Sequence, residues 1–471
     1  MTDLLTANFA DHWVLDPVAG LAGVADVSLV AGQIVSVTWR DGEAAARACW
    51  AAGANPGPGD PTVALLPALI DLHAHFRQPG ANASEEVESG TRAAAHGGYG
   101  TVALMPNTEP AADNVETLQA AIAGERHSVR LLPIAAATVG RAGTQVSDVA
   151  ALVKAGAVAI SDDGSPIADR AIFRAALLAA AAAGIPLIEH CEDPTLTAGG
   201  EAADGLVASR LGLRPWPAAG ELRAVESAIA VLRDVVASAP TARLHLTHLS
   251  TAAALAVVRA AQGEGLPLTC DVTPHHIALT DGWIAGDSRW AWEVPVDDEF
   301  LVPTTAAFDS NLRVCPPLRT MIDAFACREA LRNGTALAIG TDHAPHSREK
   351  KEVEFGLAAN GIAGIETCLS VALSAHRAGE LSLATIVAAL TTGPARLLAI
   401  TTTSVTPGAV ASFVQVDLAA SWRPSRATLL GRSINTPLLG RQLRGVVQLT
   451  VLEGRLAYQR PRGAFCATMV P

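Results

Sequence analysis

The sequence lacks the features that mark membrane, secreted and nucleic-acid-binding proteins. No apolar run approaches the roughly 20 residues that a membrane-spanning helix needs, and residues 1–6 show no basic region followed by an apolar core. Basic residues are in the minority, with 34 Lys and Arg against 46 Asp and Glu and a net charge of -12. We therefore expect a cytoplasmic protein with neither a nucleic-acid nor a membrane partner.

Cysteine is scarce and irregularly spaced. The 471 residues include 7 Cys, none of them in a CxxC pair. An odd number of scattered cysteines in a large chain favours reduced thiols over a disulfide framework. Hydrophobic residues make up 50% of the chain, so it can bury a large core and form one big domain with an accessory one.

Strand-like and helix-like stretches alternate through the middle of the chain. The helical stretches, such as 168–183, 221–237 and 251–262, are rich in Ala and Leu at helical spacing. Eight β-type runs precede or separate them: 63–75, 100–106, 129–137, 156–162, 185–190, 242–248, 266–272 and 335–342. This alternation predicts an α/β fold, a (β/α)₈ TIM-type barrel over residues 63–400. Short β-like pieces in residues 1–62 and 401–471 predict one small β domain formed from both chain ends.

Two histidines close the first of these runs. His73 and His75 lie two residues apart, and strand side chains alternate between faces, so both imidazoles can reach one metal ion. An isolated His-x-His pair is usually a coincidence. Here, further candidate ligands follow later runs: Asp162 or Asp163, His190, His248 and Asp342. Imidazoles and carboxylates at successive strand ends suit a hydrolytic divalent metal such as zinc, with no thiolate needed.

Several motifs resemble those of one enzyme family. The chain is similar over nearly its whole length to the class I bacterial dihydroorotases of the amidohydrolase superfamily. The matching stretches are Asp71–Gly80, Gly97–Val102 with Met105–Thr108, Ser161–Gly164, His190–Asp193, His248–Thr251, Val272–His276, Pro316–Arg319, Thr341–His346 and Asn360–Thr367. The resemblance implies a hydrolase for cyclic amides that interconverts dihydroorotate and N-carbamoyl-aspartate in pyrimidine synthesis.

The resemblance also implies roles for individual residues. Asp342 would be the catalytic acid and base. One or two Zn²⁺ ions would be held by His73, His75, Asp163, His190, His248 and Asp342, with Asp163 preferred to Asp162 as the bridging ligand. The small-molecule substrate would contact His75, Arg77, Asn107, Cys315, His346, Asn360 and Gly361. The family further suggests a homo-oligomer and aspartate transcarbamoylase as a candidate partner.

Residue chemistry supports the expected substrate contact of Arg77. It lies two residues past His75 and therefore faces the same way, where its planar fork can clamp a carboxylate bidentately. Asn107 follows a strand-like run, where its amide can match the donor and acceptor of a cyclic imide.

Two features depart from this simple interpretation. Cys315 stands where the family usually has Asn, and a thiol cannot supply the paired donor and acceptor of an amide. Residues 282–300 form a long connection with three Trp, for which we expect an ordered packing or interface role. The alternative functions are a hydantoinase- or allantoinase-like amidase, or an inactive homologue that acts as a structural partner of aspartate transcarbamoylase.

Overall fold

The computed structural model describes residues 4–124, 127–294 and 303–461. Its centre is an eight-stranded sheet with the order β14-β13-β12-β9-β8-β7-β6-β5, in which every neighbouring pair is parallel. The strands are β5 (Leu69–Ala74), β6 (Tyr99–Leu104), β7 (Arg130–Ala136), β8 (Ala159–Ser161), β9 (Leu187–His190), β12 (Leu244–Thr247), β13 (Leu268–Val272) and β14 (Ala336–Ile339). The predicted barrel class is confirmed.

The first and last strands meet and close the sheet into a barrel. Ala74 pairs with His343, and the backbone N–H of His75 donates to the carbonyl of His343 at 2.9 Å. Asp71, fully buried in β5, accepts hydrogen bonds from the backbone N–H and the hydroxyl of Thr341. This closure brings the histidines that follow Asp71 next to the segment after β14.

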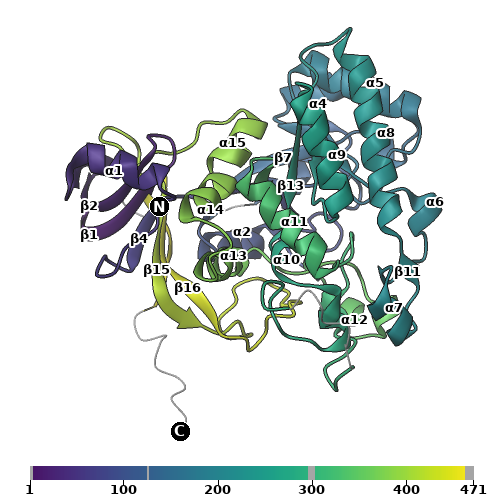
Figure 1. Cartoon of the computed structure of the whole chain (residues 1–471). Helices are drawn as coiled ribbons and strands as arrows, with labels where there is room; N and C mark the ends of the chain where they lie inside the picture. Colours follow the sequence, from purple (N-terminus) through teal and green to yellow (C-terminus); the bar gives the residue numbers. More distant parts are fainter. Residues whose placement is uncertain (1–3, 125–126, 295–302, 462–471) are drawn as a thin grey trace.

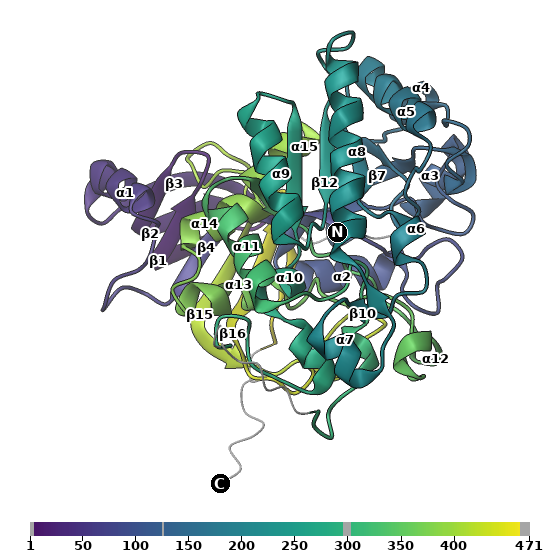
Figure 2. The same ribbon diagram turned by 45° about the vertical axis from the view of Figure 1, so that its right-hand side comes forward.

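Helices surround the barrel between successive strands (Figure 2). The main ones are α2 (Val87–His96), α3 (Val115–Ala121), α4 (Val149–Lys154), α5 (Arg170–Ala183), α8 (Ala218–Val236), α9 (Ala252–Gly263), α11 (Met321–Arg332), α13 (Cys368–Arg377), α14 (Leu383–Leu390) and α15 (Thr392–Leu398). The helical stretches expected at 168–183, 221–237 and 251–262 are α5, α8 and α9.

Helix α5 shows how the Ala-rich stretches form helices. The Asp169 side chain accepts hydrogen bonds from the first backbone N–H groups, and Gly184 ends the helix in the left-handed region at φ 73°. The buried residues recur at helical spacing and face the barrel: Phe173, Ala176, Leu177, Ala180 and Ala181. Small alanines let the helix pack closely on the sheet.

Both chain ends form one small β domain, as predicted. Figure 1 shows the purple N-terminal strands beside the yellow C-terminal strands β15 and β16. The sheet order is β17-β16-β15-β4-β1-β2-β3. Its strands are β1 (Ala7–Asp16), β2 (Leu21–Val30), β3 (Gln33–Trp39), β4 (Val63–Pro67), β15 (Phe413–Trp422), β16 (Leu443–Leu452) and β17 (Arg455–Gln459), and α1 (Gly42–Ala51) packs on β2 and β3. A separate core contains Phe9, Val14 and Val27 from one end and Phe413 and Val451 from the other.

Residues 63–75, which the sequence predicts to be one strand, form two strands, β4 and β5. Residues 63–67 pair with β15 and β1 in the outer sheet, whereas 69–74 begin the barrel. The apolar run continues through the change because both strands are buried. The division of the chain into domains at residue 62 stays a prediction, and β4 belongs to the sheet of the terminal strands.

Shorter elements occupy the connections after the barrel strands. They are η1 (Val139–Arg141), α6 (Pro194–Thr197), β10 (Ala202–Ala203), α7 (Leu206–Leu211), β11 (Pro215–Trp216), α10 (Pro274–Ala278), η2 (Asp281–Ala285), η3 (Ser310–Leu312), α12 (Arg348–Lys351) and η4 (Phe355–Leu357). Among the described residues, no helix has the length and apolarity that a membrane span requires.

The described part of the Trp-rich connection packs against the C-terminal segment. Trp283 and Trp290 are buried, and Trp292 stacks on Trp290 with ring centroids 5.3 Å apart. The guanidinium of Arg441 lies 4.0 Å from the Trp290 ring centroid and donates to the carbonyl of Ser288 at 2.5 Å. The expected packing role holds for residues 282–294, and residues 295–300 lie outside the described ones.

Candidate metal centre and substrate pocket

The candidate ligands lie at the carboxyl ends of different barrel strands. His73 lies in β5 and His190 is the last residue of β9, while His248 directly follows β12. Asp163 and Asp342 follow β8 and β14 within three residues. Because the carboxyl ends of parallel strands open on one face of a barrel, residues far apart in sequence meet there.

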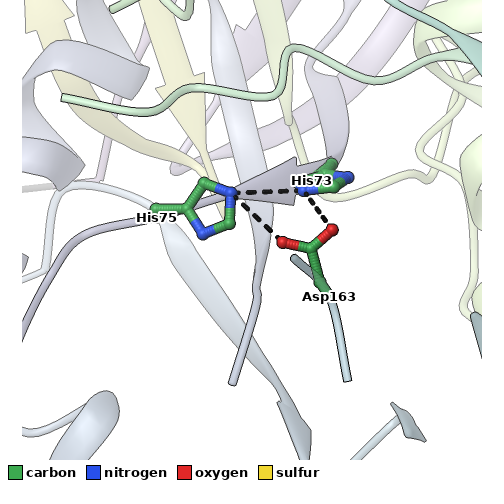
Figure 3. A group of neighbouring side chains, drawn as sticks. All are labelled: His73, His75 and Asp163. Carbon is green, nitrogen blue, oxygen red and sulfur yellow. Dashed lines mark hydrogen bonds and ion pairs between the residues drawn. The ribbon is translucent and has the colours of Figure 1, made fainter. Parts of the chain in front are cut away.

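The structure brings these side chains into two groups that share Asp163. His73, His75 and Asp163 form one group, and Asp163, His190 and His248 form the other. Within each group, one possible ligand atom per residue lies within 4.8 Å of the others. Figure 3 shows the first group, with both imidazoles turned toward the carboxylate. His73 Nε2 lies 3.4 Å from Asp163 Oδ1, and His75 Nε2 lies 3.6 Å from Asp163 Oδ2.

Asp342 joins the first group. Its Oδ1 lies 3.2 Å from His75 Nε2 and 3.6 Å from His73 Nε2. Its backbone, like that of His248, is left-handed, with φ values of 44° and 42°. Such conformations cost of order 1–3 kcal/mol in a residue other than glycine and cluster at functional sites. The hydrogen bond from the His248 N–H to Asp271 Oδ1, at 2.7 Å, supports one of them.

Buried polar atoms of this cluster face one another and one of them lacks a hydrogen-bond partner, as expected of a site that binds a divalent metal ion. Asp163 Oδ1 is buried and has no hydrogen-bond partner. Ring nitrogens face each other at 3.2 Å between His73 and His75, and at 3.0 Å between His190 and His248. Each of these ligands is between 1% and 5% exposed. Buried polar atoms that converge without partners, in an imidazole and carboxylate set, could hold one or two zinc-like cations.

Electrostatics also favour positive charge at this position. Burial acts to lower the pKa of His73, but the nearby carboxylates of Asp163, Asp342 and Asp271 together raise the pKa to about 9. Burial acts to raise the pKa of Asp163, yet the charge of His73 and the nearby imidazoles of His190 and His248, 3.7 and 3.5 Å away, hold the pKa well below its ordinary value. The carboxylate therefore stays ionised and attracts a cation.

The neighbouring residues Asp162 and Asp163 direct their carboxylates to different partners. The Asp162 carboxylate accepts hydrogen bonds from the backbone N–H of Thr138 at 3.0 Å and from the Thr138 hydroxyl. It therefore secures the turn after β7, whereas Asp163 points to the histidines. The structure thus places Asp163 in the cluster, whereas Asp162 has a structural role.

A second layer of hydrogen bonds fixes how the imidazoles face the centre. His73 Nδ1 contacts Thr247 Oγ1 at 2.8 Å, and Thr247 in turn donates to Asp271 at 3.0 Å. His190 Nε2 contacts Glu192 Oε2 at 3.1 Å. Such partners set the tautomer of a ligating imidazole. Sequence reasoning missed Thr247, Glu192 and Asp271, although the proximity of Glu192 to His190 offered a signal.

The expected substrate residues line one cavity of about 230 Å³ beside the cluster. It is bordered by His75, Arg77, Asn107, Asp163, Gly164, His190, His248, Cys315, Asp342, Ala344, His346, Asn360 and Gly361. Every residue expected to contact substrate is therefore among those that meet here. Their roles as ligands or substrate contacts stay predictions.

Arg77 and His346 form one corner of this cavity. The Arg77 Nε–H donates to the carbonyl of Pro345 at 3.2 Å, and its Nη2 lies 3.3 Å from His346 Nε2. His346 Nε2 also lies 2.8 Å from the carbonyl oxygen of Asn360. Burial and the charge of Arg77 lower the pKa of His346 to about 3, so this imidazole is neutral. The corner therefore presents one positive charge, that of Arg77.

Some pocket residues are already engaged within the protein. Asn107 Oδ1 lies 2.7 Å from His75 Nδ1, and its Nδ2 donates to Asp163 at 3.4 Å. The backbone N–H of Gly361 donates to the carbonyl of Arg313 at 2.8 Å. Gly361 has φ 144°, and a Cβ there would lie 2.5 Å from the Cβ of Ala344, so the position requires glycine.

Cys315 lies between the cluster and Glu192. Its Sγ is 3.5 Å from His190 Nε2 and 3.6 Å from Glu192 Oε2. Burial raises the pKa of this thiol, and the nearby His190 opposes the shift only in part. The thiol therefore stays protonated and donates weakly to the Glu192 carboxylate.

Comparison with known proteins identifies the family. A family model described as Dihydro-orotase-like matches residues 63–254. The dihydroorotase of Anaeromyxobacter dehalogenans (strain 2CP-1 / ATCC BAA-258) is 38% identical over 458 residues, which cover 95% of this chain and 97% of that protein. The chain belongs to the dihydroorotase family. The dihydroorotase of Pelotomaculum thermopropionicum is 37% identical over 451 residues, with coverage of 95% and 97%. The expected resemblance and the assignment as an enzyme are confirmed.

Solved structures confirm the fold of this dihydroorotase family member. The L-hydantoinase (dihydropyrimidinase) from Arthrobacter aurescens has a TM-score of 0.75 at 20% identity, covering 97% of this chain and 96% of that chain. The dihydropyrimidinase from Brevibacillus agri NCHU1002 has a TM-score of 0.71 at 19% identity, with coverage of 96% and 95%. At these identities the similarity concerns the fold alone.

Proposed function

We propose that this chain is a zinc-dependent dihydroorotase that interconverts (S)-dihydroorotate and N-carbamoyl-L-aspartate in pyrimidine biosynthesis. One observation carries the proposal beyond the family match: the Arg77 cation borders the same cavity as the His and Asp cluster. Dihydroorotate combines a hydrolysable cyclic amide with a carboxylate, and the cavity offers a partner for each.

The cluster provides the hydrolytic half of the site. We assign one or two Zn²⁺ ions to His73, His75, Asp163, His190, His248 and Asp342. When bound, zinc supplies a water of lowered pKa and polarises the amide carbonyl. The protein residues fix this arrangement through the hydrogen bonds that His73 makes with Thr247 and that His190 makes with Glu192.

Asp342 supplies the proton transfer that reversible amide hydrolysis requires. Burial acts to raise its pKa, but the hydrogen bond with His75 and the charge of His73 hold the pKa below the ordinary value. The carboxylate is therefore ionised and borders the cavity, where it can accept a proton from the attacking water. Returning that proton to the ring nitrogen completes hydrolysis, and the reverse transfer serves ring closure.

The other side of the cavity holds the substrate. Arg77 binds the carboxylate through its planar fork, and His346 and the Asn360–Gly361 backbone form the adjoining wall. Asn107 connects the two halves, because it contacts His75 and Asp163 while bordering the cavity. Cys315 occupies the position of the usual Asn, so we assign that substrate contact to neighbouring groups.

A turnover assay tests the proposal. The zinc-loaded protein is assayed with dihydroorotate, hydantoin and allantoin, and with N-carbamoyl-aspartate in the reverse direction. We expect dihydroorotate to be the best hydrolytic substrate. Preference for hydantoin or allantoin would assign the chain to a different cyclic amidase, and no turnover of any of them by zinc-loaded protein would favour an inactive homologue.

The convergence of all six expected ligands speaks against the inactive homologue, because the side chains that hydrolysis needs meet at one site. Homo-oligomerisation, an association with aspartate transcarbamoylase and a cytoplasmic location stay predictions.

A further inference from the structure

The segment between β15 and β16 reaches back to the loops of the candidate pocket. Ser433, Asn435, Thr436 and Leu438 in this segment are between 0% and 8% exposed. Glu366 holds the middle of this segment, because its carboxylate accepts from the backbone N–H groups of Leu430 and Gly431. The segment is thus anchored to the barrel before it reaches Asn435.

Asn435 joins two walls of the pocket. Its side-chain Nδ2 donates to the carbonyl of Ala344 at 3.1 Å and to the carbonyl of Gly361 at 3.0 Å. Its Oδ1 accepts from the backbone N–H of His346 at 3.0 Å. The carbonyl of Asn435 also accepts from the backbone N–H of Ala363 at 2.9 Å.

Only a carboxamide matches this set of partners. Two carbonyl oxygens require two N–H donors, and one backbone N–H requires an acceptor, which together use both amide hydrogens and the amide oxygen. An aspartate would keep the acceptor for His346 and would lose both donors. A leucine of similar size would lose all three hydrogen bonds.

The three partners belong to the part of the pocket proposed to contact substrate. His346 lies against Arg77, and Gly361 follows Asn360, whose carbonyl contacts the His346 ring. The Gly361 carbonyl has a second donor, Lys351 Nζ at 3.1 Å, which is not part of the segment. Loss of Asn435 therefore removes the partners of the Ala344 carbonyl and of the His346 N–H, while the Gly361 carbonyl keeps its bond to Lys351.

We propose that Asn435 is a positioning residue of the substrate pocket, which the C-terminal part of the chain supplies to the barrel. Through the backbones of Ala344 and His346 it sets the place of the His346 ring and hence of the Arg77 guanidinium. This inference rests on the proposed function, since the substrate that reports it is dihydroorotate. It assigns to Asn435 an effect on substrate binding and none on the proton transfer by Asp342.

The experiment compares wild type, Asn435→Leu, Asn435→Asp and a matched control, Thr450→Val. The Thr450 hydroxyl donates to the carbonyl of Ala95 at 2.7 Å, so the control loses one buried hydrogen bond of the same C-terminal part without touching the pocket. We expect both Asn435 variants to raise KM for dihydroorotate about tenfold or more while kcat stays within about threefold, as loss of a buried hydrogen bond at a binding wall predicts. The control should keep the wild-type KM, and metal content should be equal in all four proteins.

Two further measurements separate positioning from a general structural role. In a His346→Ala background, Asn435→Leu should raise KM less than about twofold, because the residue it positions is gone. Hydrogen exchange of the His346 backbone amide, whose N–H donates to Asn435 Oδ1, should quicken about tenfold in Asn435→Leu and not in Thr450→Val. The proposal would be overturned by an unchanged KM, by a fall in kcat as large as the rise in KM, or by additive effects of the two substitutions on KM in the double variant. Failure of the wild type to turn over dihydroorotate would instead overturn the proposed function, and the exchange measurement still tests the anchoring by Asn435.

Discussion

Replacing Arg77 by Lys tests the substrate assignment most directly. The guanidinium is fixed by the carbonyl of Pro345 and lies against His346, so its fork has a set orientation at the cavity wall. Lysine keeps the positive charge but has a compact ammonium on a flexible stem, without a planar pair of donors. The substitution therefore removes bidentate geometry and leaves the charge.

The expected effect follows from one lost hydrogen bond to a charged group. Such a bond contributes roughly 1.5–3 kcal/mol, and about 1.4 kcal/mol corresponds to a factor of ten. We therefore expect KM for dihydroorotate to rise roughly 10- to 100-fold in Arg77→Lys. The cluster around Asp163 does not include Arg77, so metal content should not change.

The assay uses two substrates that differ in the carboxylate. Dihydroorotate and dihydrouracil share the six-membered cyclic amide, and dihydrouracil lacks the group that Arg77 is proposed to bind. Arg77→Lys should impair hydrolysis of dihydroorotate and leave the slower hydrolysis of dihydrouracil nearly unchanged. An unchanged KM for dihydroorotate, or the same loss with both substrates, would refute the carboxylate clamp.

Four further predictions concern the metal, the proton shuttle, Cys315 and the anchor of the C-terminal segment. Chelation should abolish dihydroorotate turnover and Zn²⁺ should restore it; equal turnover by metal-free protein would contradict the assignment. Asp342→Asn should lower kcat by about 10²- to 10⁴-fold while elemental analysis still finds much of the metal, and a near-normal kcat would exclude its acid and base role. Cys315→Asn should change kcat/KM for dihydroorotate only modestly, whereas a gain of about 1–3 kcal/mol would mean that the present pocket suits another cyclic amide. Burial raises the pKa of Glu85 from 4.5 to about 7. The folded protein thus binds more protons than the unfolded chain between these values, and stability falls as pH rises through them. Between pH 5 and pH 8 the free energy of unfolding, measured with urea, should fall by about 3 kcal/mol more in the wild type than in Glu85→Gln. An identical pH dependence in both proteins would contradict this prediction.

Residues placed by local chain geometry could be predicted from the sequence. The two-residue spacing of His73 and His75 follows from strand alternation, and His190 and His248 follow from the rule that barrel sites form at carboxyl strand ends. The choice between Asp162 and Asp163 could not follow from the spacing alone, because either can face the site once the strand has ended. Only the Thr138 contacts of Asp162 settle which carboxylate faces the histidines.

The two strands in the 63–75 run show a second limit of sequence reasoning. Both strands are buried and apolar, so the composition does not change where the chain passes from the outer sheet to the barrel. The passage depends on pairing partners far along the chain, β15 for the first strand and β6 for the second. Hydrophobic pattern indicates burial and not which sheet receives the strand.

The contacts of Asn435 with the pocket could not be predicted from the sequence around it. It lies in no regular element and is 91 residues from Ala344 and 74 from Gly361, so no periodicity connects it with the pocket. Its position depends on both chain ends forming one sheet, since the segment that carries it joins β15 and β16 of that sheet. The same connection is fastened to the barrel by Glu366 and Glu85, so side chains of the barrel as well as the terminal sheet fix where Asn435 lies. The connection between two strands of the small β domain thus supplies one carboxamide that holds backbone groups of the proposed substrate pocket.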